Sequence, residues 1–246
     1  MTTLFISDLH LDAVRPGITE LFLTFLREEA RRASSLYILG DFFEAWIGDD
    51  DDDPHHARVM AGLKELTAAG VPVSFMHGNR DFLIGEGFVR RTGVKLLPDP
   101  TVLDLYGTPT LLMHGDTLCT DDVEYQMVRR MLRDPAWQQD YLAKSLTERR
   151  AIAAHARAQS KAHTAAKAEY IMDVNQKAVA ATMQKHGVTR MIHGHTHRPA
   201  VHRFKSDGKD RERIVLGDWY EQSSRLRFDE SGGMLEDARV PNGDMD

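Results

Sequence analysis

The chain has 246 residues, of which 42% are hydrophobic and 28% are charged, values typical of a folded domain with an apolar core. Its formal net charge of −6 argues against a nucleic-acid scaffold, because such proteins usually carry an excess of Lys and Arg, and we expect no nucleic-acid partner. Cys119 is the only cysteine, so a disulfide within the chain is excluded.

The first half of the chain alternates short apolar runs with amphipathic segments. The apolar runs are typical of strands buried on both faces, and they span residues 3–7, 36–39, 73–76 and 110–113. Between them, residues 18–32 and 56–69 carry apolar side chains at helical spacing. Strands that alternate with helices predict an α/β sandwich.

The composition changes after Asp121, where Ala, Gln, Lys, Arg and Glu dominate and helical periodicity replaces the strand pattern. We predict long helices over 146–167 and 174–186, and a shorter one that ends at Asp134 and Pro135. Strand-like runs resume at 191–192, 200–204, 214–216 and 226–228. The prediction is therefore a core formed by residues 1–120 and 187–240, a helical insertion over 121–186 and a flexible tail over 241–246.

Five of the predicted strands end in the same way. Each apolar run is followed by a side chain that can bind a metal, usually with a glycine within one or two residues. These side chains are Asp8 and His10, Asp41, Asn79, His114, and His195 with His197. Strands of an open α/β sheet converge at their carboxyl ends, and glycines let the backbone approach a ligand closely. We therefore expect the seven side chains to lie together.

Two aspartates, one asparagine and four histidines offer both oxygen and imidazole nitrogen. This mixture favours Mn, Fe or Zn over Ca or Mg, and the lack of a thiolate argues against a closed structural zinc site. Seven ligands fit two ions that share a carboxylate, a pair able to activate water for displacement at phosphorus. One motif alone would equally suit a turn or a cap. His77 and His193 precede their glycines, and we expect them to pack or to support the ligands.

The assembled motifs resemble those of the calcineurin-like metallophosphoesterase family. They are Asp8-Leu9-His10, Gly40-Asp41, Gly78-Asn79-Arg80-Asp81, His114-Gly115-Asp116 and Gly194-His195-Thr196-His197. The resemblance implies two β-sheets flanked by helices, with the insertion as a helical lid. It also implies that Asp8, His10, Asp41 and His197 hold one ion, and that Asp41, Asn79, His114 and His195 hold the other, with Asp41 as the bridge.

Arg80 stands where the family usually has a histidine that protonates the leaving group or contacts phosphate. An arginine does not donate a proton at neutral pH, but it can clamp a phosphate oxygen. This favours a leaving group that needs little acid help, such as a phosphate of a pyrophosphate; a substitution without functional consequence is the alternative. The expected catalytic residues are Asn79, Arg80 and His195.

Arg80 and the insertion together resemble a narrower family, the UDP-2,3-diacylglucosamine diphosphatases of bacterial lipid A synthesis, and so do residues 4–11, 40–46, 76–83 and 194–199. The resemblance implies two Mn²⁺ ions and water attack on the α-phosphorus of the UDP-lipid, which gives UMP and 2,3-diacylglucosamine 1-phosphate. It also implies a peripheral position on the cytoplasmic face of the inner membrane.

The N-terminus lacks a signal-peptide pattern, and no run approaches the ~20 apolar residues of a spanning helix. We expect a monomer.

Arg157, Ser160, Thr164 and Lys167 share one narrow face of the predicted helix 146–167, because they fall at i, i+3, i+7 and i+10. On the residues alone, a solvated polar face is the simpler interpretation. The resemblance implies instead that this face binds substrate, although relatives are expected to have Asn in place of Thr164. The predicted substrate contacts are Asn79, Arg80, Asp122, Arg157, Ser160, Thr164, Lys167 and His195.

Apolar residues of the insertion allow two interpretations, an acyl-chain groove or packing of the lid helices on one another. They are Met131, Leu132, Trp137, Tyr141 and Ile152.

Two other functions compete with the lipid pyrophosphatase. One is a calcineurin-like phosphodiesterase or phosphatase acting on a soluble substrate. The other is a scaffold without metals, which is disfavoured because every expected ligand is present.

Overall fold

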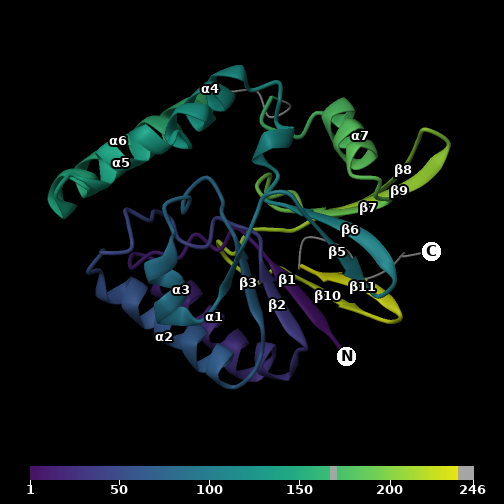
Figure 1. The fold of residues 1–246 in the computed structure, drawn as a ribbon, viewed down its shortest axis with the longest axis horizontal. Helices are drawn as coiled ribbons and strands as arrows, with labels where there is room; N and C mark the ends of the chain where they lie inside the picture. Colours follow the sequence, from purple (N-terminus) through teal and green to yellow (C-terminus); the bar gives the residue numbers. More distant parts are fainter. Residues whose placement is uncertain (167–170, 238–246) are drawn as a thin grey trace.

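Two β-sheets pack face to face, with helices on their outer faces (Figure 1). The computed structural model describes residues 1–166 and 171–237, without the side chains of 161–166. The predicted tail over 241–246 lies outside the described residues. The predicted α/β fold of two flanked sheets is confirmed, and both sheets are mixed.

The first sheet has the strand order β11-β10-β1-β2-β3-β4. Its parallel strands are β1 (Thr3–Ile6), β2 (Ser35–Ile38), β3 (Val73–Met76) and β4 (Lys95–Leu97). The antiparallel strands β10 (Arg225–Asp229) and β11 (Gly232–Glu236) extend it past β1. The helices α1 (Pro16–Glu28), α2 (Pro54–Ala68) and α3 (Glu86–Thr92) cover its outer face.

The second sheet has the order β5-β6-β7-β9-β8. Its strands are β5 (Thr101–Leu105), β6 (Thr108–Met113), β7 (Arg190–His193), β8 (Ala200–Ser206) and β9 (Lys209–Val215). The three central strands, β6, β7 and β9, run parallel, and the edge strands run antiparallel to them. The carboxyl ends of β6 and β7 therefore point the same way.

The strands are apolar on both faces because three layers of core surround the two sheets. Phe5, Met76, Leu112 and Ile192 belong to the layer between the sheets. A second layer joins the first sheet to α1–α3, and Trp219 is fully buried in it. The third layer lies between the second sheet and α7 (Gln176–Lys185).

The helices after Asp121 have clear local causes. Asp134 accepts hydrogen bonds from the amides of Ala136 and Trp137, so the break between α4 (Val123–Leu132) and α5 (Pro135–Leu142) is a helix start with Pro135 in its first turn. The long helix α6 (Leu146–Ala166) follows. Asn175 caps α7, which therefore begins at Gln176 and not at the predicted 174.

The first of these helices contacts the core least. No residue of α4 is buried, and its apolar stripe is exposed at Val123, Met127 and Met131. By contrast, Tyr141 of α5 is buried and Trp137 packs partly against the core of the first sheet. Of the described helices, none combines the length and apolar character needed to cross a bilayer.

The acidic run at 49–53 fastens α6 to the rest of the chain. Arg149 is almost fully buried, pairs with Asp50, and donates to the carbonyl of Ile47 at 2.7 Å. Arg150 pairs with Asp51 at 2.8 Å and also with Asp52. This acidic run therefore binds the start of α6.

Candidate metal centre

The seven predicted metal ligands lie in one crevice, where strands of both sheets end. Backbone hydrogen bonds hold the connecting loops against one another, from the amide of Asp8 to the carbonyl of Gly40 at 3.0 Å and from His10 to Asp41 at 2.9 Å. In the second sheet, the amide of Gly194 donates to the carbonyl of His114 at 2.9 Å. The crevice is thus formed by the first sheet at β1, β2 and β3 and by the second at β6 and β7.

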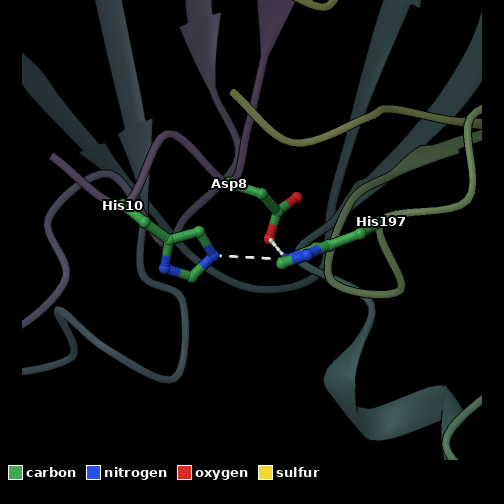
Figure 2. A group of neighbouring side chains, drawn as sticks. All are labelled: Asp8, His10 and His197. Carbon is green, nitrogen blue, oxygen red and sulfur yellow. Dashed lines mark hydrogen bonds and ion pairs between the residues drawn. The ribbon is translucent and has the colours of Figure 1, made fainter. Parts of the chain in front are cut away.

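The first group consists of Asp8, His10 and His197, whose candidate ligand atoms all lie within 4.8 Å of one another (Figure 2). The Nε2 atoms of His10 and His197 are 3.2 Å apart. Asp8 Oδ1 lies 3.4 Å from His197 Nε2. One carboxylate and two imidazoles therefore face a common point.

The second group consists of Asp41, His114 and His195, again within 4.8 Å, together with Asn79. Asn79 Oδ1 lies 3.0 Å from His114 Nε2 and 2.9 Å from His195 Nδ1. Asp41 connects the two groups, because its Oδ2 is 3.8 Å from His10 Nε2 and its Oδ1 is 3.7 Å from His114 Nε2. This is the position expected of a bridging carboxylate.

The backbone is strained at these residues. Seven non-glycine residues in the described part of the chain have a positive φ, and five of them are predicted ligands. They are Asp8 (56°), His10 (48°), Asp41 (52°), His195 (69°) and His197 (56°). Left-handed backbone at such residues costs free energy, about 1–3 kcal/mol each, and is concentrated at functional sites.

Three of the imidazole rings have an oxygen atom close to Nδ1, the nitrogen that faces away from the crevice. Carboxylates face Nδ1 of two of them: Glu44 Oε2 lies 3.1 Å from Nδ1 of His10, and Asp218 Oδ2 lies 3.4 Å from Nδ1 of His197. His114 has its Nδ1 2.8 Å from the carbonyl oxygen of Leu39. A hydrogen on Nδ1 leaves the lone pair of Nε2 directed into the crevice, which is the tautomer that a metal ligand needs.

These donor atoms fit divalent cations. Asp8 Oδ1 is buried and accepts no hydrogen bond. Asn79 Oδ1 faces the ring nitrogens of His114 and His195, and rotating the amide would let its nitrogen donate to both. With the hydrogen of His114 on Nδ1, the present arrangement brings lone pairs together. A cation among them makes this arrangement favourable.

The directions of two pKa shifts agree with a cation site. Burial alone would raise the pKa of Asp8, but the close contact with His197 and the charge of that ring hold it well below its usual range. Burial alone would lower the pKa of His114, but Asp41, Asp116 and Asp8 raise it to about 9. The crevice therefore attracts positive charge, and binding of a cation there should release a proton.

Buried polar contacts hold the two carboxylates in place. The amide of His195 and the hydroxyl of Ser7 donate to Asp8 Oδ2, at 2.9 Å and 2.5 Å. The amide of Arg80 donates to Asp41 Oδ1 at 2.9 Å. Asp81 joins the neighbouring loops, because its two oxygens accept from the amides of Phe42 and Gly78, both at 2.7 Å.

The other predicted site residues occupy different positions. Arg80 lies at the rim, 21% exposed, with Nε 3.9 Å from Asp41 Oδ2. Asp122 caps α4 by accepting from the amide of Tyr125, and Arg157 pairs with Glu44. Ser160 is half-buried on α6. The side chain of Thr164 and all of Lys167 lie outside the described residues.

His77 and His193 make other contacts. Nε2 of His77 lies 2.7 Å from the carbonyl oxygen of Ile84. Nδ1 of His193 lies 2.9 Å from the carbonyl of Gly194, and Arg213 donates to its Nε2 at 3.1 Å. Because both ring nitrogens of His193 are engaged, this histidine suits a supporting role better than metal binding.

Sequence reasoning missed three residues of the site. Asp218 follows strand β9 and Gly217, the same signal that identified the other strand ends, and could have been found in that way. Glu44 and Tyr220 carried no such signal. The Tyr220 ring stacks on His10 with centroids 5.3 Å apart and lies 5.6 Å from His197.

Residues 1–199 match the family model of the calcineurin-like phosphoesterases. The chain belongs to this family. The match includes every strand end that contributes to the two groups of side chains.

Curated relatives of this phosphoesterase resemble it over almost its whole length. A protein of Stenotrophomonas maltophilia strain K279a, named UDP-2,3-diacylglucosamine hydrolase, is 55% identical over 96% of this chain and 98% of its own. A protein of Xanthomonas oryzae pv. oryzae with the same name has the same identity and coverage. Among solved structures, an archaeal phosphodiesterase is 13% identical over 96% of this chain and 100% of its own, with a TM-score of 0.47.

The first prediction concerns Gly78 of this phosphoesterase. A Cβ atom there would lie 2.2 Å from both the amide nitrogen and Oδ1 of Asp41. We expect Gly78→Ala to displace Asp41 and to weaken Mn²⁺ binding by about 10–100-fold, measured by calorimetric titration of metal-free protein. Gly17→Ala is the control, because a Cβ there meets nothing within 4 Å. Wild-type affinity in Gly78→Ala would show that Asp41 does not bridge the groups.

The second prediction concerns pH. Burial alone would raise the pKa of Asp116, but His114, His195 and Arg129 hold it well below its usual range. A carboxylate with a depressed pKa stabilises the fold above its unfolded pKa of about 3.9, and this contribution is lost as pH falls through the folded value. We therefore expect the stability gap between wild type and Asp116→Asn to narrow below about pH 4.

Urea unfolding of metal-free protein between pH 6 and pH 3 measures this gap. Asp140→Asn, which removes an exposed carboxylate of α5, controls for the loss of a charge. A gap that stays constant over the whole range would contradict the assigned direction.

Proposed function

We propose that this chain hydrolyses the pyrophosphate bond of UDP-2,3-diacylglucosamine and releases UMP and 2,3-diacylglucosamine 1-phosphate. The observation that carries the proposal is the pair of side-chain groups joined by Asp41. Its substrate rests on relatives 55% identical over 96% of the chain, each named UDP-2,3-diacylglucosamine hydrolase. These relatives favour the lipid pyrophosphate over a soluble phosphodiester.

In this proposal two divalent cations bind in the crevice. Asp8, His10, Asp41 and His197 would hold one, and Asp41, Asn79, His114 and His195 the other. The donor set mixes carboxylate and amide oxygen with imidazole nitrogen and suits Mn, Fe or Zn. Among these we propose Mn²⁺, which the resemblance to the UDP-2,3-diacylglucosamine diphosphatases implies. When bound, the pair supplies an activated water and stabilises charge on the phosphoryl oxygens.

The residues around the cations have separate roles. Arg80 at the rim would clamp an oxygen of the pyrophosphate and offset negative charge in the transition state, since its guanidinium stays protonated. Burial, and then the charge of His114, lower the pKa of His195 to about 4. Its ring is therefore neutral at neutral pH and has a nitrogen lone pair that can accept a hydrogen bond or bind a metal. Asn79 lies between His114 and His195, with Oδ1 3.0 Å and 2.9 Å from their ring nitrogens, and would hold the second cation together with them.

The sugar and phosphates of the lipid are proposed to contact the helical insertion. Its predicted contacts are Asp122, Arg157, Ser160, Thr164 and Lys167. A hollow of about 460 Å³ lies between α6 and the loop after β2; Leu11, Ala45 and Ile47 form part of its lining, and charged side chains such as Asp51 and Arg150 form the rest. We propose that an acyl chain uses the apolar part of this hollow, because Trp137 and Tyr141 are already packed on the core.

We further propose a monomer bound peripherally at the cytoplasmic face of the inner membrane. The lipid substrate requires contact with a membrane surface. The exposed stripe of Val123, Met127 and Met131 on α4 offers apolar area for such contact. The proposed division into a core (1–120 and 187–240) and a lid (121–186) places this stripe on the lid.

The decisive experiment compares two substrates with Mn²⁺-loaded protein. We expect UMP to be released from UDP-2,3-diacylglucosamine in mixed micelles, and little hydrolysis of bis(p-nitrophenyl) phosphate. In H₂¹⁸O, attack on the α-phosphorus places the label in UMP and none in the lipid phosphate. Turnover of the aryl diester alone would refute the lipid substrate, and label in the lipid phosphate would refute attack at the α-phosphorus.

Two variants separate metal binding from phosphate binding. His114→Ala should lose one Mn²⁺ ion per chain and most of its activity. Arg80→Ala should keep both ions yet lose about 10²–10³-fold in kcat, because it removes a charge-stabilising donor. Arg90→Ala, on the exposed surface of α3, should keep full activity. Metal analysis and UMP release measure these effects, and normal turnover by Arg80→Ala would exclude the clamp.

A further inference from the structure

Glu44 lies between a predicted metal ligand and the long helix of the insertion. Its Oε2 is 3.1 Å from Nδ1 of His10. Its other oxygen, Oε1, accepts from Arg157 Nε at 2.8 Å and also pairs with Nη2 of the same guanidinium. One carboxylate therefore contacts both the crevice and α6.

The backbone holds Glu44 beside His10. Leu11 and Phe43 form a parallel bridge, and the amide of Glu44 donates to the carbonyl of Leu11 at 3.1 Å. The side chain of His10 is 1% exposed and that of Glu44 is 22% exposed. The contact is thus shielded from solvent on the His10 side. Because electrostatic interactions are stronger away from water, the carboxylate there has a strong influence on which ring nitrogen carries the hydrogen.

The His10 ring has little other support at Nδ1. Tyr220 stacks on its face with the two rings nearly parallel, so it does not engage the edge that carries Nδ1. Arg15 donates to the backbone carbonyl of His10 and not to its ring. Among the residues that the structure describes, Nδ1 has no aligned hydrogen bond, and the Glu44 carboxylate 3.1 Å away is the acceptor that favours the tautomer with hydrogen on this nitrogen and the Nε2 lone pair toward Asp8 and His197.

We infer that Glu44 is a positioning residue that couples cation binding at the first group to the docking of α6. A cation on Nε2 of His10 makes its Nδ1 hydrogen a stronger donor to Glu44. Arg157 in turn holds Glu44 in the orientation that receives this hydrogen. Because coupling between two sites is reciprocal, a bound cation should strengthen the attachment of α6 near Arg157, and loss of Arg157 should weaken the cation.

A second arginine of α6 offers a matched control variant. Arg150 lies on the same helix, two turns before Arg157, and pairs with Asp51 and Asp52, away from the predicted ligands. Arg150→Met therefore removes an ion pair between helix and core without touching Glu44. The inference rests on the proposed cation site and is independent of the proposed lipid substrate.

The first experiment titrates metal-free full-length protein with Mn²⁺ by calorimetry. Glu44→Gln should weaken one of two binding steps by about 10–100-fold and leave the other unchanged, since Glu44 faces the first group only. Arg157→Met should weaken the same step by a smaller factor. The double variant should be no weaker than Glu44→Gln, and Arg150→Met should bind as the wild type does.

The second experiment follows amide hydrogen exchange in residues 153–160. In the wild type and in Arg150→Met, Mn²⁺ should slow exchange in this segment. In Glu44→Gln and Arg157→Met it should not. Circular dichroism of each variant verifies that the helix is formed before the metal is added.

The outcomes separate this inference from the proposed function. Two unaltered Mn²⁺ steps in Glu44→Gln would overturn the positioning role. Equal effects of Arg150→Met and Arg157→Met would show general loosening of α6 and overturn the coupling. Wild-type protein that binds no Mn²⁺ would refute the proposed cation site itself, and with it the inference.

Discussion

The structure depends on two buried carboxylates that occupy the same crevice. Asp8 and Asp41 are at most 2% exposed, and the removal of charged groups from water is costly unless partners compensate. Backbone amides, the Ser7 hydroxyl and imidazoles supply this compensation. The left-handed backbone at Asp8 and Asp41 is the conformational cost of pointing both carboxylates inward. Strand order, close glycines and loop contacts all serve this arrangement.

Much of the fold follows from hydrophobic patterning. The buried strands β1, β2, β3 and β6 were predicted within a few residues, because apolar residues on both faces leave a continuous signal. The strands β4, β5 and β11 gave no clear pattern: they are short edge strands with exposed residues. Their pairing is decided by distant partners, which a local pattern does not contain.

The functional site was likewise predicted only in part from the sequence. Its ligands follow buried strands, so chain position alone predicted that they would meet. Glu44 and Tyr220 contact the His10 ring, and these contacts depend on the packing of segments that are separate in the sequence. The acidic run at 49–53 is conspicuous in the sequence, but the arginines that pair with it lie about one hundred positions away. Nothing in the run itself identifies these partners.

The convergence of both sheets on one crevice has a mechanical consequence. His10 follows a strand of the first sheet and His197 a strand of the second, 187 positions apart, yet their ring nitrogens are 3.2 Å from each other. A cation held by both would act as a cross-link that closes a very long loop, as a disulfide does in other proteins. This chain, with a single cysteine, would then rely on coordination chemistry to hold its two halves in register.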